Sequence, residues 1–351
     1  ELNNSRIIVI PVTGCGIASY QGVGTVFIKN SEQRVTDSER AEAHQNARIH
    51  PLETDRSVLN SSESYFVIDD RLRLRNPINQ TAYKLDAHVH IVHALTNRLE
   101  NFRTVVRESG YEDNVEMVFA PLASGVGVLT EEEREGGVLL IDFGAGVTEY
   151  VMEFNNGTIA SGMLQVGFDH VLNDLSIGLD LPIESCRKLV EGGTLSQLMH
   201  DRSDYVDFPS STGKVRRIPL SSFETIVDQR LRETFEIIRR KVGHASELNR
   251  INCGGVLTGG GALFDRSGRL FREVFDLSVR VGQPIDIGGA VTGLENPRYS
   301  TVWGALKIAD YYQNLQSDSS AGIFQRFSSS VGEMADKLRR SFGGFRGSFR
   351  V

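Results

Sequence analysis

The stretch that decides the fold reads Val138-Leu-Leu-Ile-Asp-Phe-Gly-Ala-Gly-Val-Thr-Glu-Tyr-Val-Met152. An apolar run ends at the acidic residue Asp142, two glycines follow within four positions, and a second β-rich run begins at once. This pattern predicts a β-hairpin whose turn carries almost no side chains. Because glycine has no Cβ, the backbone N–H groups of such a turn can approach an anion closely. At the end of the strand, the carboxylate of Asp142 could hold a metal-bound water.

A second glycine-rich segment, Gly254-Gly-Val-Leu-Thr-Gly-Gly-Gly-Ala262, follows later in the chain. Here a short apolar strand runs into three consecutive glycines and then into an expected helix. The earlier pattern D-x-G-x-G-x-T resembles the phosphate-2 loop of the actin-like ATPase superfamily. The later segment resembles the adenosine motif of that superfamily, in which the backbone lies flat against the adenine. The ordered pair is more specific than either turn alone, although two ordinary glycine turns are the alternative. We expect the two turns to face each other across a cleft.

Composition limits the class of protein. The 351 residues suggest about two domains, and 40% hydrophobic with 24% charged residues is normal for a globular chain with a sizeable core. The net charge of −7 argues against a general nucleic-acid-binding protein. No apolar run approaches the roughly 18 residues of a membrane span. The three scattered cysteines form no ligand pair, which fits a reducing cytoplasm.

Periodicity predicts the main elements. Residues 16–94 read as an α+β block, with a polar helix over Ser38–Arg48 capped by Asp37 or Ser38. Residues 184–250 read as mainly helical. The other expected elements are a strand over Ser5–Ile10, a helix over Thr96–Ser109, a strand over Val115–Ala120, a helix from Leu122, an amphipathic helix over Phe223–Val242, a strand over Val279–Gly282 and a helix over Tyr299–Tyr312.

Taken together, the motifs resemble the FtsA family of bacterial cell-division actin homologues. They are Leu122-Ala-Ser-Gly-Val-Gly-Val-Leu-Thr130, the glycine hairpin, Val256-Leu-Thr-Gly-Gly-Gly261 and Tyr299-Ser-Thr-Val-Trp-Gly-Ala305. The resemblance covers essentially the whole chain. It implies an α/β fold of the actin-like (ribonuclease H-like) type, two-lobed, with an inserted α+β SHS2 subdomain and a C-terminal amphipathic tail. The implied parts are 1–15 (partial IA), 16–94 (IC, SHS2-type), 95–136 (IA), 137–178 (IIA), 179–250 (helical IIB), 251–297 (IIA), 298–312 (closing helix of IA), 313–330 (linker) and 331–351 (tail).

The resemblance also implies the ligands. ATP and Mg²⁺ would bind at the glycine turns, with Mg²⁺ held through its water by Asp142. Arg230 and Glu233 lie one turn apart on the long helix and match residues that approach the ribose, although a surface ion pair is an equal alternative. The implied nucleotide-binding residues are Asp142, Gly144, Ala145, Gly146, Val147, Thr148, Arg230, Glu233, Gly259, Gly260 and Gly261.

Three departures from the family pattern are notable. Nothing before residue 15 can supply the family's phosphate-1 loop, so we expect two strands, a glycine turn and a helix to be missing, through truncation or gene decay. Aligning Pro121-Leu-Ala with the chaperones' E-P-T-A places Ala120 where those ATPases orient the attacking water. Alanine cannot accept a hydrogen bond, and such a loss typically costs about 10² or more in rate, so we expect weak hydrolysis at most. Glu149 replaces the usual Asp, and it is either a solvated strand carboxylate or a residue near the metal.

The end of the chain carries a separate signal. On a helix, Met334, Leu338, Phe342, Phe345 and Phe349 form one apolar stripe. Basic neighbours flank this stripe, which is typical of a helix lying in an anionic membrane surface, while a tail packed on its own domain is the alternative. The predicted membrane-binding residues are Met334, Leu338, Arg339, Arg340, Phe342, Phe345 and Phe349.

By resemblance, the chain would be a nucleotide-binding adaptor and not an enzyme. It would polymerise, bind the FtsZ C-terminal tail through IIB, meet other division proteins through IC, and lie at the division septum on the cytoplasmic side of the inner membrane. The cationic helix end at Arg239-Arg240-Lys241 could bind the FtsZ tail or simply compensate the helix dipole. Two alternatives stay open: a PilM-like adaptor of a pilus or secretion machine, and an ATPase or sugar-kinase-type enzyme of the same superfamily.

Overall fold

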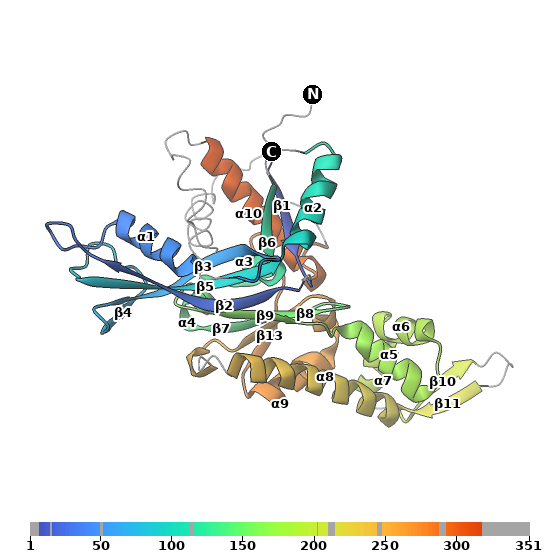
Figure 1. The fold of residues 1–351 in the computed structure, drawn as a ribbon. Helices are drawn as coiled ribbons and strands as arrows, with labels where there is room; N and C mark the ends of the chain where they lie inside the picture. The colour runs from blue at the N-terminus through green and yellow to red at the C-terminus, as the bar shows by residue number, and fades with distance from the viewer. Residues whose placement is uncertain are drawn as a thin grey trace, which may run out of the picture.

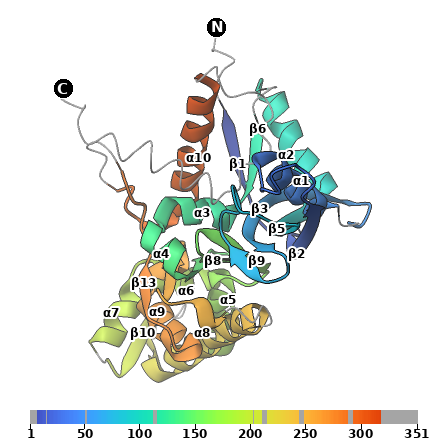
Figure 2. The same ribbon diagram turned by 90° about the vertical axis from the view of Figure 1, so that its left-hand side faces the viewer.

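Two lobes and one projecting block make up the part of the chain that is described (Figures 1 and 2). The computed structural model describes residues 7–14, 16–49, 52–111, 115–201, 203–209, 215–243, 248–287 and 293–317, so the predicted tail at 331–351 lies outside it. In the first lobe a parallel pair of strands lies beside helices that are far apart in the sequence. Its elements are β1 (Ile8–Val12), α2 (Thr96–Glu108), β6 (Val115–Phe119), α3 (Ala120–Val128), α4 (Glu131–Gly136) and α10 (Ser300–Ser317).

The second lobe is built on a five-stranded sheet of order β13-β12-β7-β8-β9. In this sheet β7 pairs in parallel with β12 and antiparallel with β8, which confirms the predicted hairpin. The strands are β7 (Val138–Phe143), β8 (Thr148–Phe154), β9 (Gly157–Leu164), β12 (Gly255–Thr258) and β13 (Val279–Val281).

The projecting block corresponds to the predicted α+β insertion, and its sheet is antiparallel with the order β2-β5-β3-β4. Helix α1 crosses β2 so closely that a Cβ atom on Gly24 would lie 2.0 Å from the carbonyl oxygen of Ala43. The predicted cap of this helix was wrong: Thr36 is the N-cap and forms a capping box with Glu39. The elements are β2 (Ala18–Phe27), α1 (Asp37–Arg48), β3 (Arg56–Ile68), β4 (Leu72–Leu74) and β5 (Lys84–Leu95).

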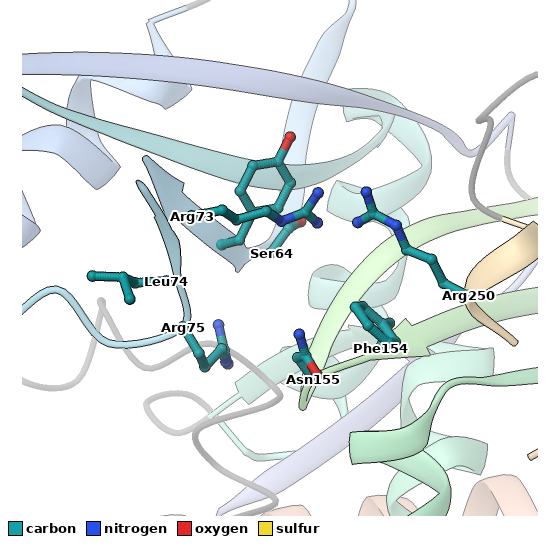
Figure 3. A pocket seen from close by; sticks show the side chains of 8 residues that line it. Ser64, Arg73, Leu74, Arg75, Phe154, Asn155 and Arg250 are labelled. Atoms are coloured by element: carbon teal, nitrogen blue, oxygen red, sulfur yellow. The ribbon is translucent and has the colours of Figure 1, made fainter. Parts of the chain in front are cut away.

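The block rests on the outer strand β9 of the second lobe through polar contacts. Ser19 Oγ donates to the carbonyl of Ser161 at 2.7 Å, and Gln21 Nε2 donates to the carbonyl of Ile159 at 2.7 Å. Gly157 allows the closest approach, because a Cβ atom there would lie 2.6 Å from the carbonyl oxygen of β3 residue Ser64. At the edge of this junction is a pocket of about 350 Å³ (Figure 3).

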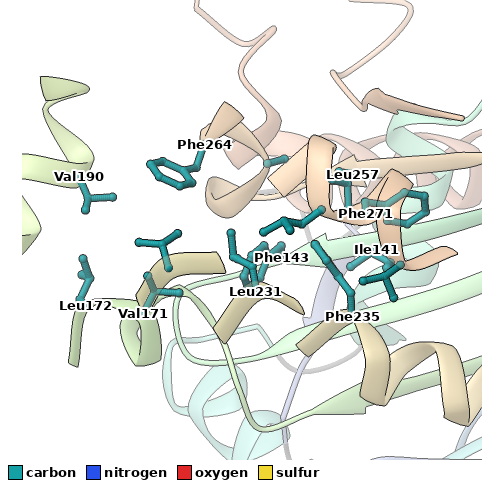
Figure 4. Close-up of a cluster of buried hydrophobic side chains, with 14 of the residues drawn as sticks. Ile141, Phe143, Val171, Leu172, Val190, Leu231, Phe235, Leu257, Phe264 and Phe271 are labelled. Atoms are coloured by element: carbon teal, nitrogen blue, oxygen red, sulfur yellow. The ribbon is translucent and has the colours of Figure 1, made fainter. Parts of the chain in front are cut away.

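The core explains why β7 reads as an uninterrupted apolar run. Its side chains alternate between two faces, and both faces are covered. Leu139, Ile141 and Phe143 pack into the cluster that joins the sheet to the helices of the second lobe, shown in part in Figure 4. Val138 and Leu140 pack into the cluster shared with the first lobe.

The helical part of the second lobe contains one element that the sequence reading missed. Residues 184–250 were predicted to be mainly helical, but β10 and β11 form an antiparallel hairpin there, with Val206 and Ile218 buried on one face and Asp207 paired with Arg217 on the other. Its two short, charged strands give too brief an alternation to separate from helix. The elements are α5 (Phe168–Leu179), α6 (Ile183–Glu191), α7 (Thr194–His200), β10 (Tyr205–Pro209), β11 (Val215–Pro219), α8 (Leu220–Gly243), η1 (Leu248–Arg250), η2 (Gly260–Leu263) and α9 (Asp265–Phe275).

The closing helix α10 begins after the short turn η3 (Pro297–Tyr299) and runs to Ser317, past the predicted end at Tyr312. The first residues of the predicted linker, 313–317, are therefore helical, because Gln313-Asn-Leu-Gln316 contains good helix formers and the Ser-rich sequence starts only beyond them. Helices α10 and α3 touch backbone to backbone at Gly127 and Gly304. None of the described helices is both long and apolar enough to cross a membrane.

Candidate functional site

The two glycine turns lie side by side. Because β7 and β12 are parallel neighbours, with Asp142 opposite Thr258, both turns leave the same edge of one sheet. The expectation that they face each other across a cleft was therefore wrong. Gly259 has φ +80°, and a Cβ atom there would lie 2.5 Å from Asp142 Oδ1. Only glycine suits that position, which explains the first of the three consecutive glycines.

Asp142 joins the second lobe to the first. Its Oδ2 accepts hydrogen bonds from Ser124 Oγ at 2.6 Å and Thr301 Oγ1 at 3.0 Å, and these two hydroxyls are 2.8 Å apart. Burial raises the pKa of Asp142, while the two hydrogen bonds act in the opposite direction. The quoted motifs contain both hydroxyl residues, yet the sequence reading assigned them no role. Ser124 lies on α3 and Thr301 on α10, so the carboxylate is held from the first lobe.

The first turn is seated on the N-terminus of α5. The amides of Phe168 and Asp169 donate to the carbonyls of Gly144 and Ala145, at 3.0 and 2.8 Å. Within the turn, the amide of Gly144 donates to the carbonyl of Val147 at 3.0 Å. These contacts hold the turn in one shape.

Gly146 and Thr148, two of the predicted ligands in this turn, differ in their surroundings. Among the described residues, no atom beyond the adjacent ones lies within 4 Å of the place where a Cβ on Gly146 would stand, so this point of the turn faces away from the described part of the chain. Thr148 is fully buried, and its hydroxyl donates to the carbonyl of Val166 at 2.6 Å. The side chain of Thr148 therefore supports the turn from inside the protein.

Glu149 lies directly opposite Asp142 in the β7–β8 register and is only 4% exposed. The reading of Glu149 as a solvated strand carboxylate was wrong, because β8 is an inner strand with both faces covered. Its Oε1 accepts a hydrogen bond from the amide of Gly14, in the turn after β1, at 3.3 Å. Burial, with a smaller contribution from the charge of Asp142, raises the pKa of Glu149 to about 7, against hydrogen bonds from Thr13 and Gly14.

Arg230 is tied to α5 by an ion pair that the sequence reading missed. Its Nε and Nη2 bind the two carboxylate oxygens of Asp174 at 2.6 and 3.0 Å, and its Nη1 binds Glu233 at 2.6 Å. The ion pair named as the alternative reading is thus present, within a network of three charged groups. At the second turn, the charged group nearest to the Cβ position of Gly260 is Arg298, whose Nε is 3.7 Å away.

The residues present fit a nucleotide with Mg²⁺. Carboxylate oxygen is a preferred ligand of Mg²⁺, which keeps several waters and usually takes one or two carboxylates plus phosphate oxygens. Among the described residues, no group of three or more His, Cys, Asp and Glu side chains could hold a metal ion by itself. A cation at Asp142 would accordingly draw its other ligands from phosphate and water, for which the open side of Gly146 leaves room.

Comparison with known proteins identifies the family. A family model described as cell division protein FtsA matches residues 139–304, and a model of the SHS2 domain inserted in FtsA matches residues 14–93. Cell division protein FtsA of Borreliella burgdorferi is 27% identical over 300 residues, which cover 85% of this chain and 72% of that protein. The FtsA protein of Neisseria meningitidis serogroup B is 28% identical over 321 residues, which cover 90% of this chain and 76% of that protein.

The solved PilM–PilN type IV pilus biogenesis complex has a similar fold, with a TM-score of 0.50, 14% sequence identity and coverage of 86% of this chain and 79% of that chain. This likeness concerns the fold alone and confirms the predicted actin-like α/β architecture. Of the two FtsA models, by contrast, one matches the second lobe and the start of α10, and the other matches the projecting block. The chain therefore belongs to the FtsA family of actin-like cell-division proteins, and its projecting block is the SHS2 domain of that family.

Proposed function

We propose that this chain is an ATP-binding adaptor that polymerises and tethers FtsZ to the cytoplasmic face of the inner membrane at the division septum. The observation that carries the nucleotide part is the geometry around Asp142. One carboxylate and two glycine turns meet at a single sheet edge, and one of those turns faces open space at Gly146. Such side-chain-poor turns favour phosphate and the flat face of a base.

In this proposal the nucleotide is a structural ligand. The backbone around Gly146 would receive the phosphates, and the turn at Gly259–Gly261 would lie against the adenine. Asp142 would hold Mg²⁺ through its bound water, and the ion would supply positive charge to offset that of the phosphates. Isothermal titration calorimetry of ATP, with and without Mg²⁺, tests this directly. Saturable binding that weakens without Mg²⁺ is expected, and absence of binding at millimolar ATP would remove the proposal.

We expect this site to hydrolyse ATP slowly at most. Ala120 is the first residue of α3, is buried, and offers no side-chain acceptor for a water. Glu149, the other carboxylate beside Asp142, accepts a hydrogen bond from the Gly14 amide. A phosphate-release assay with saturating ATP and Mg²⁺ should show turnover far below one per second. Turnover of several per second would favour the enzyme alternative.

FtsZ binding is proposed at the basic end of α8. There Arg239 donates to the carbonyl of Val274 on α9 at 2.7 Å, while Arg240 and Lys241 are exposed. Fluorescence anisotropy with a labelled FtsZ C-terminal peptide should show binding that weakens when Arg240 and Lys241 are both changed to Glu. If the peptide does not bind, the proposal that this chain tethers FtsZ fails.

Membrane attachment is proposed through the tail at residues 331–351, whose structure is not described. Liposomes containing anionic lipid should co-sediment with the protein, and Phe342→Glu should reduce the bound fraction, because it places a charge in the apolar stripe. Equal sedimentation of both proteins would count against the tail. We also propose that the chain associates with itself and that its SHS2 domain binds other division proteins.

A further inference from the structure

A serine, a histidine and a glutamate are joined by hydrogen bonds inside the SHS2 domain. His44 lies on α1, while Ser61 and Glu63 lie two residues apart on β3 and therefore on one face of its sheet. His44 Nε2 is 3.1 Å from Ser61 Oγ, and His44 Nδ1 is 3.3 Å from Glu63 Oε1. This Ser61–His44–Glu63 cluster belongs to the SHS2 domain, whereas both glycine turns belong to the second lobe.

Glu63 sets the direction of these hydrogen bonds. Burial acts to raise its pKa, but the hydrogen bond from His44 and the charge of Arg40 outweigh burial and lower the pKa, so the carboxyl group is ionised. An ionised carboxylate can only accept hydrogen bonds, so Nδ1 of His44 carries a proton. In the neutral ring Nε2 is then left as an acceptor, and Ser61 donates its hydroxyl hydrogen to it.

Burial holds the two inner members of the cluster in place. His44 is 2% and Glu63 is 3% exposed, and Arg40 Nε donates to the Glu63 carboxylate at 3.1 Å. Ser61, at the outer end, is only partly buried, so its hydroxyl is the member that a small reagent would meet. A hydroxyl that donates to a base, with that base oriented by a third group, is the arrangement that activates serine as a nucleophile.

A second contact between a serine and a histidine has the opposite polarity. His90 Nε2 is 2.7 Å from Ser161 Oγ, but His90 Nδ1 faces Gln21 Nε2 at 3.3 Å. That amide nitrogen is a donor, since it also donates to the carbonyl of Ile159 at 2.7 Å. Nδ1 of His90 therefore accepts, and Nε2 of the neutral ring carries the proton and donates it to Ser161. His90 cannot act as a base toward Ser161, so the carboxylate partner is what distinguishes the Ser61–His44–Glu63 cluster.

We propose that Ser61 is a nucleophile that accepts an acyl group from an activated acyl donor, which makes it a site of covalent modification in the SHS2 domain. Ser61 Oγ bonds to the acyl carbon while its proton passes to His44 Nε2. The bond between the acyl carbon and the leaving oxygen breaks, and the leaving group takes that proton from His44. The products are an ester on Ser61 and a free phosphate or alcohol, with no change in oxidation state. Glu63 acts through His44 and is a positioning residue.

Site-resolved acetylation of the full chain tests the proposal, with p-nitrophenyl acetate and acetyl phosphate as separate probes and mass spectrometry as the readout. Ser61 should be acetylated at least about 100-fold faster than Ser109, because a positioned general base typically contributes about 10²–10⁴-fold. Ser109 is the matched control, since it is exposed and its hydroxyl donates to the carbonyl of Val105 at 2.8 Å. Ser61→Ala should lose the label, and His44→Gln should slow acetylation of Ser61 about 100-fold.

The positioning role of Glu63 has a readout of its own. Glu63→Asp should restore part of the acetylation rate that Glu63→Gln loses, because only a carboxylate keeps the proton of His44 on Nδ1. Equal rates in these two variants, with the same melting temperature, would overturn the role of Glu63.

Unfolding the wild type covers the case in which a buried variant does not fold. In urea sufficient to unfold the chain, Ser61 should react no faster than Ser109. Equal rates at the two serines in the folded chain would overturn the proposal, as would wild-type acetylation of Ser61 in a folded His44→Gln variant. Fast acetylation of Ser61 in the unfolded chain would overturn it too, since the rate would then not depend on the cluster.

Discussion

Gly146→Val gives the sharpest test of the nucleotide site. A Cβ atom on Gly146 would meet no atom of the other described residues within 4 Å, and the residue does not have positive φ. The variant should therefore fold normally, because replacing glycine at a compatible backbone position usually changes stability by less than about 1 kcal/mol. The added methyl groups would instead occupy the space in which a phosphate would approach the turn.

The expected effect is at least a tenfold rise in the dissociation constant for ATP, equivalent to about 1.4 kcal/mol. A ligand at 100 times its dissociation constant stabilises a protein by about 2.7 kcal/mol, and at 10 times by about 1.4 kcal/mol. At an ATP concentration 100 times the wild-type dissociation constant, the nucleotide-induced rise in melting temperature of the variant should therefore be about half that of the wild type. Calorimetric titration of both proteins measures the change in affinity without reference to stability.

The matched control for this variant is Gly268→Ala on α9. There a Cβ would meet its nearest neighbour, Val279 on β13, at 3.9 Å and would touch neither glycine turn, so ATP binding should be unchanged. Gly146→Ala should fall between the wild type and the valine variant, because it adds one methyl group. Wild-type affinity in Gly146→Val, with folding intact, would refute the assignment of this turn to phosphate.

The other predictions concern groups around the site. A protein with a carboxyl group whose pKa is raised on folding becomes less stable as the pH rises. The pKa of Glu149 is raised from 4.5 to about 7, so the wild type should lose up to about 3 kcal/mol of unfolding free energy as the pH rises through this range. Urea unfolding at pH 5 and pH 8 should show a smaller loss for Glu149→Gln. Equal pH dependence in both proteins would contradict this. Arg134 and Glu153 form an ion pair and are only 1% and 2% exposed. Glu153→Gln should therefore lower the free energy of unfolding, measured by chemical denaturation, by about 3–5 kcal/mol, and the double variant Arg134→Met/Glu153→Leu should lower it less. If the double variant is as unstable as Glu153→Gln, the stability loss does not come from a buried charge left without its partner. A Cβ on Gly304 would lie 1.7 Å from a backbone carbonyl oxygen of α3. Gly304→Ala should therefore lower stability by about 2 kcal/mol in thermal unfolding and weaken ATP binding. An unchanged melting temperature would show that the two helices can move apart without cost.

Local signals predicted the second lobe well. The run before Asp142 could be placed as a strand and its glycines as a turn, because strand and turn chemistry both lie within a few residues. The long apolar stripe of α8 was equally clear, since Phe223, Val227 and Leu231 recur at helical spacing and are all buried. Helix α8 extends only a few residues beyond its predicted bounds of Phe223–Val242.

Pairings between distant segments could not be predicted in this way. Sequence spacing does not say that β12 lies beside β7, and this neighbourhood decides whether the two glycine turns face each other or share an edge. The partners of Asp142 are distant too: Ser124 precedes it by 18 residues and Thr301 follows it by 159. Burial of Glu149 depends on the strands on either side of β8, so its own residue type gave no indication of the raised pKa.

The contacts of the two carboxylates suggest how a nucleotide could act without being consumed. Asp142 and Glu149 belong to the second lobe, but every hydrogen bond described for their carboxylates above comes from the first, through Ser124, Thr301 and the turn at Thr13–Gly14. Under the proposed function, Mg²⁺ would bind through its water at the same carboxylate that joins the lobes. Hydroxyls that donate to Asp142 would then share it with metal-bound water, so occupancy of the site and the contact between the lobes must be coupled. Such coupling needs no hydrolysis, and it agrees with the expectation from the sequence that Ala120 leaves an attacking water without a hydrogen-bond acceptor.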